Sequence, residues 1–262
     1  MGRSRHRIIH LAETGSTNAD AMRLAFTGEA LPLWVTADRQ TAGRGRTGRT
    51  WASLPGNLQA SLAFHSKAPL QQAGELSLLA AIAAIEAIRA ISPLADTTGI
   101  RLKWPNDLLI GPAKAGGILV ETTLARGEAG SQTGAGFLAV LGFGLNVASC
   151  PDDLGRAATS LAHEGVTTTA ATLLDALADQ CDLWIARWDE GRGFGAIRDA
   201  WIECAGPLGE PITVQSPSGP IAATYQGLAP SGALLAGIDG RIETITYGDV
   251  ALIAPTGKGK AQ

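Results

Sequence analysis

The run Arg39-Gln40-Thr41-Ala42-Gly43-Arg44-Gly45-Arg46-Thr47-Gly48-Arg49-Thr50-Trp51 carries the pattern on which the assignment of the fold depends. It holds four arginines and three glycines and ends in an aromatic residue. No acidic residue occurs from Arg39 through Gly74, although the formal net charge of the chain is -3. Glycines let backbone N–H groups approach a ligand closely, and arginines offer forked donors to phosphate or carboxylate oxygens. The stretch predicts an anion-binding loop, with a solvated surface loop as the alternative.

Two familiar nucleotide-binding motifs are excluded. The three glycines of the loop match G-x-G-x-x-G, but a dinucleotide-binding fold needs a helix at the last glycine and an acidic residue about 20 positions later. Pro55 and Gly56 interrupt any helix there, and the next acidic residue is Glu75. The chain contains no G-x-x-x-x-G-K-[ST] sequence, which excludes a P-loop.

Length and composition indicate a globular protein of 262 residues with one main domain and a small one. The most apolar run, residues 76–91, contains two charged residues and is too short to span a bilayer comfortably. The N-terminus lacks the long apolar region of a signal peptide. Three widely spaced cysteines and four histidines form neither a C-x-x-C motif nor a zinc-ligand cluster, which favours a reduced, cytoplasmic protein.

Hydrophobic periodicity predicts a mixture of strands and helices followed by a small β domain. Strands are expected at residues 6–11, 33–37, 57–64, 100–104, 114–121 and 137–147, and helices at 75–91, 169–188 and 194–204. Residues 126–136 are expected to form an exposed hairpin loop. Five short β-like runs after Pro207, at 212–214, 221–226, 233–238, 242–246 and 250–253, suggest a small barrel.

Three local patterns bear on a site. Thr17 with Asp20 three residues later has the form of a capping box, so we expect it to cap a helix that runs through about residue 25. Residues 137–147 alternate between large apolar residues and the set Gly142, Gly144 and Asn146, which predicts a strand with one core face and one bare face open to a ligand. Lys114, at a strand start beside paired glycines, is expected to present its ammonium to a ligand near the backbone.

Five motifs together resemble biotin–protein ligases, over residues 8 to 254. They are, in chain order, Gly15-Ser16-Thr17-Asn18, the Arg/Gly loop, Lys103-Trp104-Pro105-Asn106-Asp107, the run from Lys114 through Gly116 and Gly117 to Glu121, and Gly144-Leu145-Asn146. The resemblance implies an α+β fold in which helices pack on a mixed, largely antiparallel sheet, as in class II aminoacyl-tRNA synthetases, with a small C-terminal SH3-like β-barrel. It implies a catalytic domain at 1–206, the barrel at 207–256 and a disordered tail at 257–262. The chain begins at the catalytic domain, so no N-terminal DNA-binding domain is expected.

The resemblance also implies a two-step reaction. The biotin carboxylate attacks the α-phosphate of ATP with Mg²⁺, and a lysine of a biotin carboxyl carrier protein then takes biotin from the adenylate. Two unit charges about 4 Å apart interact with roughly 1 kcal/mol in water but about 4 kcal/mol at an effective dielectric constant of about 20. A site that joins two anions therefore needs cations, and Arg46 and Lys114 are the expected catalytic residues. We expect the loop, residues 43–50, to close over the ligand as a lid.

Site roles implied by the resemblance fall into three sets. Biotin-binding roles are expected for Ser16, Thr17, Asn18, Gln40, Arg44, Gly45, Arg46, Lys114, Gly116 and Gly117. ATP-binding roles are expected for Arg46, Arg49, Trp51, Lys103, Asn106, Lys114 and Asn146. Metal binding is expected from Asp107 and Asn146.

Three alternatives stay open at this point. A lipoate–protein ligase has the same fold and adenylation chemistry, but the loop motif favours biotin. A nucleic-acid-binding module could use the arginines, although the net charge is negative and only 5% of residues are aromatic. A biotin-sensing regulator without catalysis is disfavoured because Lys114 and the segment 103–107 are intact. We expect no nucleic-acid or membrane partner, and the sequence leaves a homodimer open.

Overall fold

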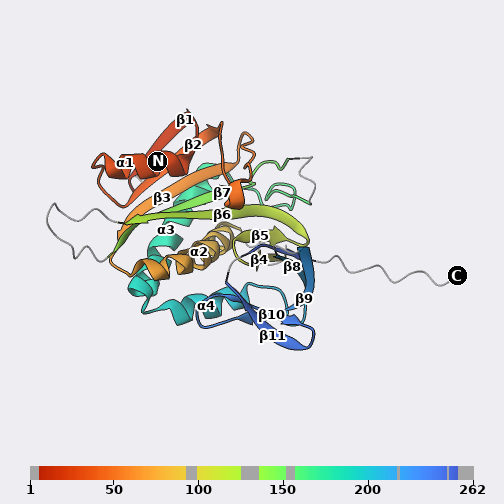
Figure 1. Ribbon diagram of the computed structural model, residues 1–262. Coiled ribbons are helices and arrows are strands. Elements are labelled where there is room, and N and C mark those ends of the chain that lie inside the picture. The colour runs from red at the N-terminus through yellow and green to blue at the C-terminus, as the bar shows by residue number, and fades with distance from the viewer. Residues whose placement is uncertain are drawn as a thin grey trace.

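The computed structural model describes residues 6–92, 99–124, 136–151, 157–216, 219–246 and 248–252. These residues form a seven-stranded mixed sheet, four α-helices and a five-stranded antiparallel sheet, arranged as in Figure 1. Residues 126–135 of the loop expected at 126–136, and the expected tail at 257–262, lie outside the described residues. None of the helices in the described ranges is long and apolar enough to cross a membrane.

The large sheet has the strand order β1-β2-β3-β7-β6-β5-β4. Its strands are β1 (Ile8–Thr14), β2 (Leu33–Gln40), β3 (Leu58–Ser66), β4 (Ile100–Lys103), β5 (Asp107–Ile110), β6 (Ala113–Leu124) and β7 (Phe137–Leu145). The β1–β2 pair is parallel and the other pairs are antiparallel. The mixed sheet with packed helices agrees with the predicted α+β fold.

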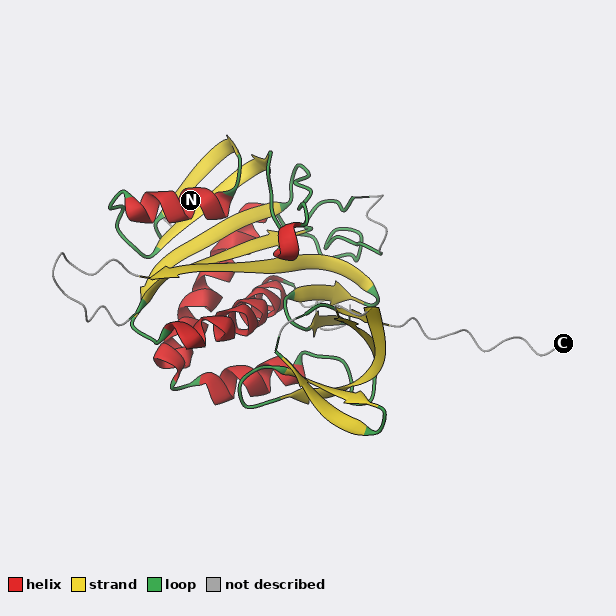
Figure 2. Ribbon diagram, viewed as in Figure 1, coloured by secondary structure: helices red, strands yellow, loops and turns green. Residues whose placement is uncertain are grey.

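Helices cover the two faces of this sheet unequally, as Figure 2 shows. On one face lie α2 (Glu75–Ile91), α3 (Ala170–Trp188) and α4 (Phe194–Glu203), and their apolar side chains share one core cluster with the strands. Helix α2 carries alanines and isoleucines on most of its sides. It is buried between the sheet and α3, because its small side chains permit close packing on several sides. On the other face, α1 (Thr17–Phe26) covers β2, β3 and β7 through a smaller cluster around Ala21.

Strand β7 shows why part of the second face stays uncovered. Leu141, Phe143 and Leu145 belong to the main core, as the alternation predicted. Gly142 and Gly144 point to the opposite face, where α1 does not reach all of the sheet. Asn18 and Trp51 lie in the space that side chains at these two positions would fill, and a pocket forms over this part of β7.

The second sheet is a small domain placed after α4. It has the order β11-β10-β9-β8-β12. Its strands are β8 (Pro211–Ser216), β9 (Gly219–Leu228), β10 (Leu234–Ile238), β11 (Arg241–Ile245) and β12 (Val250–Leu252), close to the five predicted runs. An ion pair of 2.7 Å between Arg101 and Glu210 and a hydrogen bond of 3.2 Å from Trp104 Nε1 to Gly232 O join it to the end of the large sheet at β4. These contacts bring the turn before β12 beside the large sheet.

Two local predictions need correction. The capping box at Thr17 is wrong: α1 begins at Thr17 after Ser16, and no side chain caps it. The Asp20 carboxylate instead accepts a hydrogen bond from the Thr14 hydroxyl, and the Thr17 hydroxyl bonds to Gln40. Strand β5 was not predicted, because the short turn after Lys103 makes a tight hairpin within what looked like a loop motif.

Candidate active site

A pocket opens over the bare face of β7. It lies between the start of α1, the Arg/Gly loop, β6 and the turn that precedes β12. It is lined by Ser16, Thr17, Asn18, Gln40, Arg44, Gly45, Arg46, Arg49, Thr50, Trp51, Asn106, Asp107, Lys114, Gly117, Ile118, Leu119, Gly142, Phe143, Gly144 and Asp249.

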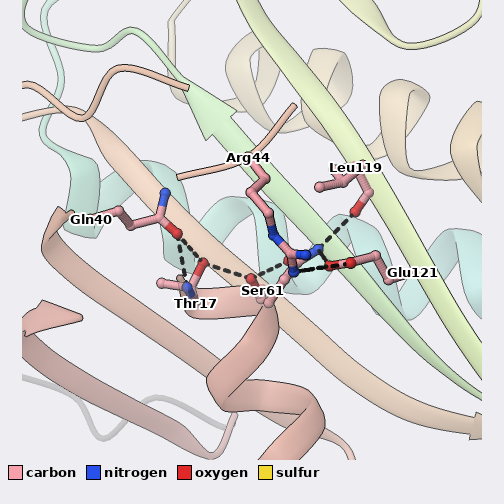
Figure 3. Close-up of polar contacts among 7 residues, drawn as sticks. Thr17, Gln40, Arg44, Ser61, Leu119 and Glu121 are labelled. Carbon is pink, nitrogen blue, oxygen red and sulfur yellow. Dashed lines mark hydrogen bonds and ion pairs between the residues drawn. The ribbon is translucent and has the colours of Figure 1, made fainter. Parts of the chain in front are cut away.

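One end of the pocket holds a network of neutral polar groups, drawn in Figure 3. The backbone N–H and the hydroxyl of Thr17 donate to Gln40 Oε1, at 2.8 and 3.1 Å. Ser61 Oγ lies 2.7 Å from Thr17 Oγ1 and 2.6 Å from Asn18 Oδ1, and a hydroxyl can donate to only one of them. Since each group can exchange partners, this end suits a ligand with both donors and acceptors.

The same network continues to an ion pair at the pocket rim. Asn18 Nδ2 donates to Leu119 O at 3.2 Å and to Glu121 Oε2 at 2.8 Å. The Glu121 carboxylate also accepts from Arg44 Nη2 at 3.1 Å. Arg44 is thereby held against β6.

The Arg/Gly loop folds back on itself. Arg44 pairs with Thr50 in an isolated β-bridge, and Trp51 N–H donates to Gly43 O at 2.9 Å. A Cβ at Gly43 would lie 2.7 Å from Trp51 O, so this close approach requires glycine. The tip is the short 3₁₀ turn η1 (Arg46–Gly48), in which Thr47 has a φ of 54°. The loop therefore presents its arginines from a closed turn.

Two of these arginines reach the small domain. Arg46 Nη2 donates to Gly248 O at 3.1 Å, and its Nη1 donates to Asn106 Oδ1 at 3.4 Å. Arg49 forms an ion pair with Asp249. The turn before β12 therefore forms one wall of the pocket.

A carboxylate between two ammonium groups lies at the base of the pocket. Asp107 is 6% exposed and pairs with Lys103 Nζ at 2.8 Å and with Lys114 Nζ. Burial by itself would raise the pKa of Asp107, but the ammonium groups of Lys114 and Lys103 outweigh it and hold that pKa below its usual value. Asp107 is therefore ionised at neutral pH and orients both lysines. Lys103 Nζ also donates to Val250 O at 2.7 Å.

The other end of the pocket is an aromatic platform. A Cβ at Gly144 would lie 2.4 Å from Trp51 Cε2, so the indole lies directly on the backbone of β7. Trp51 Nε1 donates to Gln59 Oε1 at 3.0 Å. Lys114 Nζ lies 5.7 Å from the centroid of the indole ring, within the range of a cation–π contact.

Most of the predicted site residues come together here, but three do not line the pocket. Gly116 faces the other side of the sheet, where an added Cβ would meet Leu145 Cδ2 at 2.5 Å. Lys103 lies behind Asp107 and lines a smaller cavity beside the small domain. Asn146 lines an adjoining pocket with Trp51 and Lys114, and its Nδ2 donates to Thr159 O at 2.9 Å. The structure therefore differs from the expectation that Gly116 lies in the biotin pocket.

Sequence reasoning missed several residues of the site. Gln59 and Ser61 pair with Gly144 and Gly142 across β3 and β7, so the alternation that exposed the glycines also indicated these two polar residues. Glu121 was quoted within a motif but given no role. No local signal in the sequence connects Gly248 or Asp249 with the loop.

Comparisons with known proteins agree with this architecture. Residues 14–136 match the model of the biotin/lipoate A/B protein ligase family, and residues 208–253 match the biotin protein ligase C-terminal domain. A biotin–[acetyl-CoA-carboxylase] ligase of Paracoccus denitrificans is 38% identical over 231 residues, which cover 86% of this chain and 92% of that protein. The enzyme of the same name from Mycobacterium tuberculosis is 31% identical over 248 residues, 92% of this chain and 86% of that one.

A solved structure extends the likeness to three dimensions. The biotin protein ligase from Aquifex aeolicus in complex with biotin and ATP superposes with a TM-score of 0.73 at 26% identity. The match covers 94% of this chain and 98% of that chain. Both the large sheet and the small domain of this chain therefore have counterparts in that complex.

Proposed function

This chain belongs to the biotin protein ligase family, and we propose which residues of its pocket bind biotin, which bind ATP and which promote the reaction between them. Biotin protein ligase function follows for the chain, with biotin and ATP as substrates. The observation that carries the residue assignment is the convergence of Arg46, Arg49 and Lys114 on one pocket, between a neutral polar network and an aromatic platform.

The proposed chemistry has two half-reactions. A carboxylate oxygen of biotin attacks the α-phosphorus of ATP, the bond to the β-phosphate oxygen breaks, and pyrophosphate leaves. A neutral lysine amine of the carrier then attacks the carbonyl carbon of biotinyl-5'-AMP, the bond to the phosphate oxygen breaks, and AMP and a proton leave. Both anions of the first step repel each other, so the cations of the pocket lower its barrier.

We assign the biotin ring to the neutral network at the start of α1. Its ureido group has N–H donors and a carbonyl acceptor, which complement Thr17, Gln40 and Ser61. Ser16, Asn18, Arg44, Gly45 and Gly117 complete the proposed biotin end, and Lys114 binds the carboxylate. Gly116 is not included, since it faces Leu145.

We assign ATP to the platform end. The face of Trp51 would stack on adenine, with Asn106 close to it, because the indole lies directly over Gly144. Arg46, Arg49 and Lys114 bind phosphate oxygens. Lys103 and Asn146 would act indirectly, because neither lines the pocket. Lys103 orients Asp107 through their ion pair, and Asn146 donates a hydrogen bond to the backbone carbonyl of Lys114.

A magnesium ion fits this pocket only as a companion of ATP. Among the described residues, no three His, Cys, Asp or Glu side chains gather as a metal site. Asp107 is paired with two ammonium groups, and Asn146 is bonded to backbone carbonyls. Magnesium is commonly held by one or two carboxylates together with substrate phosphates and water. Asp107 is the proposed protein ligand, and the ion would neutralise phosphate charge.

The proposed partner is a carboxyl carrier domain that docks on the open edge of β6. Within the described residues, β5 pairs with β6 only as far as Gly117. The N–H of Ile118 faces that edge, because it donates to Asn106 O at 2.9 Å. By the period of two, the peptide groups of Val120 and Thr122 face the same edge beyond the end of β5. A strand added there would lie beside the pocket.

Thr122→Pro tests the docking edge. Proline is tolerated where a strand N–H faces solvent, so the variant should fold and catalyse biotin-dependent pyrophosphate exchange as wild type does. Biotin transfer to the carrier should fall at least tenfold, while Thr122→Val, which keeps the N–H, should transfer normally. Equal transfer by all three proteins would exclude this edge. A second copy of the chain is the alternative occupant, and the molecular mass in solution distinguishes it.

Exchange of labelled pyrophosphate into ATP tests the function itself, because it isolates the first half-reaction. Biotin should support exchange and lipoate should not. Lys114→Gln should lower the rate about 100- to 1,000-fold, the usual effect of removing one preorganised charge donor. Lys67→Gln, at an exposed lysine directly after the end of β3, should leave the rate unchanged. Exchange with lipoate instead of biotin would overturn the substrate assignment.

Two further elements of the proposal concern organisation and setting. The division into a catalytic region at 1–206 and a small domain at 207–256 is supported by the end of α4 at Glu203 and the start of β8 at Pro211. A reducing, cytoplasmic setting is supported by the cysteines, all three of which are unpaired. No nucleic-acid partner is proposed, since Arg44, Arg46 and Arg49 are each bonded to other parts of the pocket.

A further inference from the structure

Gln59 is a buried polar residue that none of the site motifs contains. Its side chain rises from β3 under the pocket, and it is 1% exposed. It pairs across the sheet with Gly144, whose missing side chain leaves room for Trp51 above it. A polar side chain in such a place costs stability unless its hydrogen bonds are used.

Its amide oxygen receives two donors from opposite ends of the pocket. Trp51 Nε1 donates to Gln59 Oε1 at 3.0 Å, and Gln40 Nε2 reaches the same oxygen at 3.5 Å. Gln40 in turn accepts from the backbone N–H of Thr17 at 2.8 Å. The start of α1 and the indole of Trp51 are therefore linked through one acceptor atom.

The orientations of the Gln59 and Gln40 amides are fixed by two groups that can only donate, the indole N–H of Trp51 and the backbone N–H of Thr17. The indole N–H of Trp51 requires an oxygen, so the oxygen of Gln59 must face it. The backbone N–H of Thr17 likewise requires the oxygen of Gln40, which turns the Gln40 amide nitrogen toward Gln59. Gln59 Nε2 is left without a hydrogen-bond partner. An apolar residue at this position would carry no such penalty.

We propose that Gln59 is a positioning residue for both substrates. It holds the Trp51 indole flat for adenine and the Gln40 amide in place for the ureido group of biotin. It touches neither substrate, because Trp51 covers it and it does not line the pocket. This inference rests on the proposed function, which assigns the two ends of the pocket to those ligands.

Gln59→Met tests this role, because methionine has a similar length and no hydrogen-bonding amide. We expect the KM for ATP and the KM for biotin in pyrophosphate exchange each to rise about fivefold, the effect of losing one such hydrogen bond. The kcat should change less than twofold, since the reacting groups are untouched. His65→Met, at an exposed position of the same strand, is the matched control and should change neither KM.

A double-mutant cycle with Trp51→Phe separates positioning from a general structural role. Phenylalanine keeps an aromatic face but lacks the N–H. In the Trp51→Phe background, Gln59→Met should alter the KM for ATP less than twofold, while its effect on the KM for biotin persists through Gln40. If the methionine variant does not fold, Gln59→Asn, which withdraws the acceptor by one methylene, enters the same cycle with the same expectations.

Each result decides one of the two proposals. KM values within twofold of wild type for Gln59→Met, or an undiminished effect on the KM for ATP in the Trp51→Phe background, would overturn the role of Gln59. Absence of biotin-dependent exchange in wild type would instead overturn the proposed function. An active wild type with an unaffected Gln59 variant therefore removes the inference alone.

Discussion

Arg49 and Asp249 form an ion pair that joins the Arg/Gly loop to the small C-terminal domain. The Arg49 side chain is 52% exposed and that of Asp249 is 23% exposed, so the pair is screened by water. Such a pair contributes about 0.2–1 kcal/mol, enough to bias a loop but not to hold it shut. We therefore expect the small domain to restrain the loop until a ligand offers its own anions.

Asp249→Asn should make the loop easier to cleave. Losing an exposed pair raises the open fraction of the loop about threefold, so the initial rate of tryptic cleavage within residues 44–50 should rise by about that factor. The melting temperature should move by only about 2 °C. Cleavage sites are mapped by mass spectrometry. Asp239→Asn, in an exposed turn of the same domain, serves as control, and equal cleavage of both variants would show that Asp249 does not restrain the loop.

The buried carboxylate of Asp107 predicts a pH-dependent contribution to stability. Asp107→Asn removes the buried carboxylate that pairs with two ammonium groups and should lower the free energy of unfolding at pH 7 by about 3 kcal/mol. Because the folded pKa of Asp107 is lowered, this stabilisation is fully present above the unfolded pKa of about 4 and is lost as the pH falls through the folded pKa.

Urea unfolding from pH 8 to pH 3 measures this dependence. The difference between wild type and Asp107→Asn should be constant down to about pH 5 and then shrink as both proteins become neutral at this position. Asp38→Asn, whose side chain is 70% exposed, should show no comparable difference. If the difference in the free energy of unfolding between wild type and Asp107→Asn grew at acid pH, the lysines would not be holding Asp107 ionised.

Alanine substitutions at Gly142 and Gly144 of β7 should distinguish the proposed biotin end of the pocket from the proposed ATP end. An alanine Cβ at position 144 would lie 2.4 Å from the Trp51 ring, and one at position 142 would lie 2.2 Å from Asn18 Oδ1. Overpacking of this kind costs roughly 1–3 kcal/mol, so we expect about a tenfold rise in one KM for each variant. Gly144→Ala should affect ATP and Gly142→Ala should affect biotin.

Steady-state exchange kinetics with each substrate varied in turn measure this separation. Gly195→Ala in α4, where an added methyl meets open space, is the control for glycine replacement itself. If both pocket variants raised the same KM, the assignment of the ends would be wrong.

Tyr225 in the small domain provides a test away from the pocket. Its hydroxyl is buried without a hydrogen-bond partner, and burial raises its pKa to about 12. Tyr225→Phe removes an unsatisfied group and should leave the free energy of unfolding at pH 7 unchanged or slightly higher. Since the folded pKa is raised, wild type should lose stability relative to this variant as the pH rises from about 10 to about 12. Denaturant titrations at pH 7 and pH 11 measure both effects, and a clear destabilisation at pH 7 would reveal a partner for the hydroxyl.

Periodic patterns predicted the framework well, because they report burial directly. Residues 75–91 were expected as a helix and form α2 with the same limits. The alternation at 137–147 correctly separated the core face of β7 from its glycine face. The capping box failed because a threonine beside a strand end has other partners: Gln40 and Ser61 compete for its hydroxyl.

The chemistry of the site was only partly accessible from the sequence. Consecutive side chains of a strand point to opposite faces, so Gly116 and Gly117 could not both line one pocket, and that rule was available beforehand. The contacts of Arg46 and Arg49 with Gly248 and Asp249 depend on how two sheets meet, for which no local pattern exists. Gln59 gave no motif signal, although its pairing with Gly144 follows from strand register.

The bare face of β7 also limits how the pocket could be redesigned. Enzyme engineers commonly admit bulkier substrate analogues by trimming the side chains beneath them. Here the two β7 positions beneath the pocket have no side chain to trim, since Gly142 and Gly144 lie directly under Asn18 and Trp51. Extra room would have to come from the walls, at Ser61 or Asn18, or from a longer loop above.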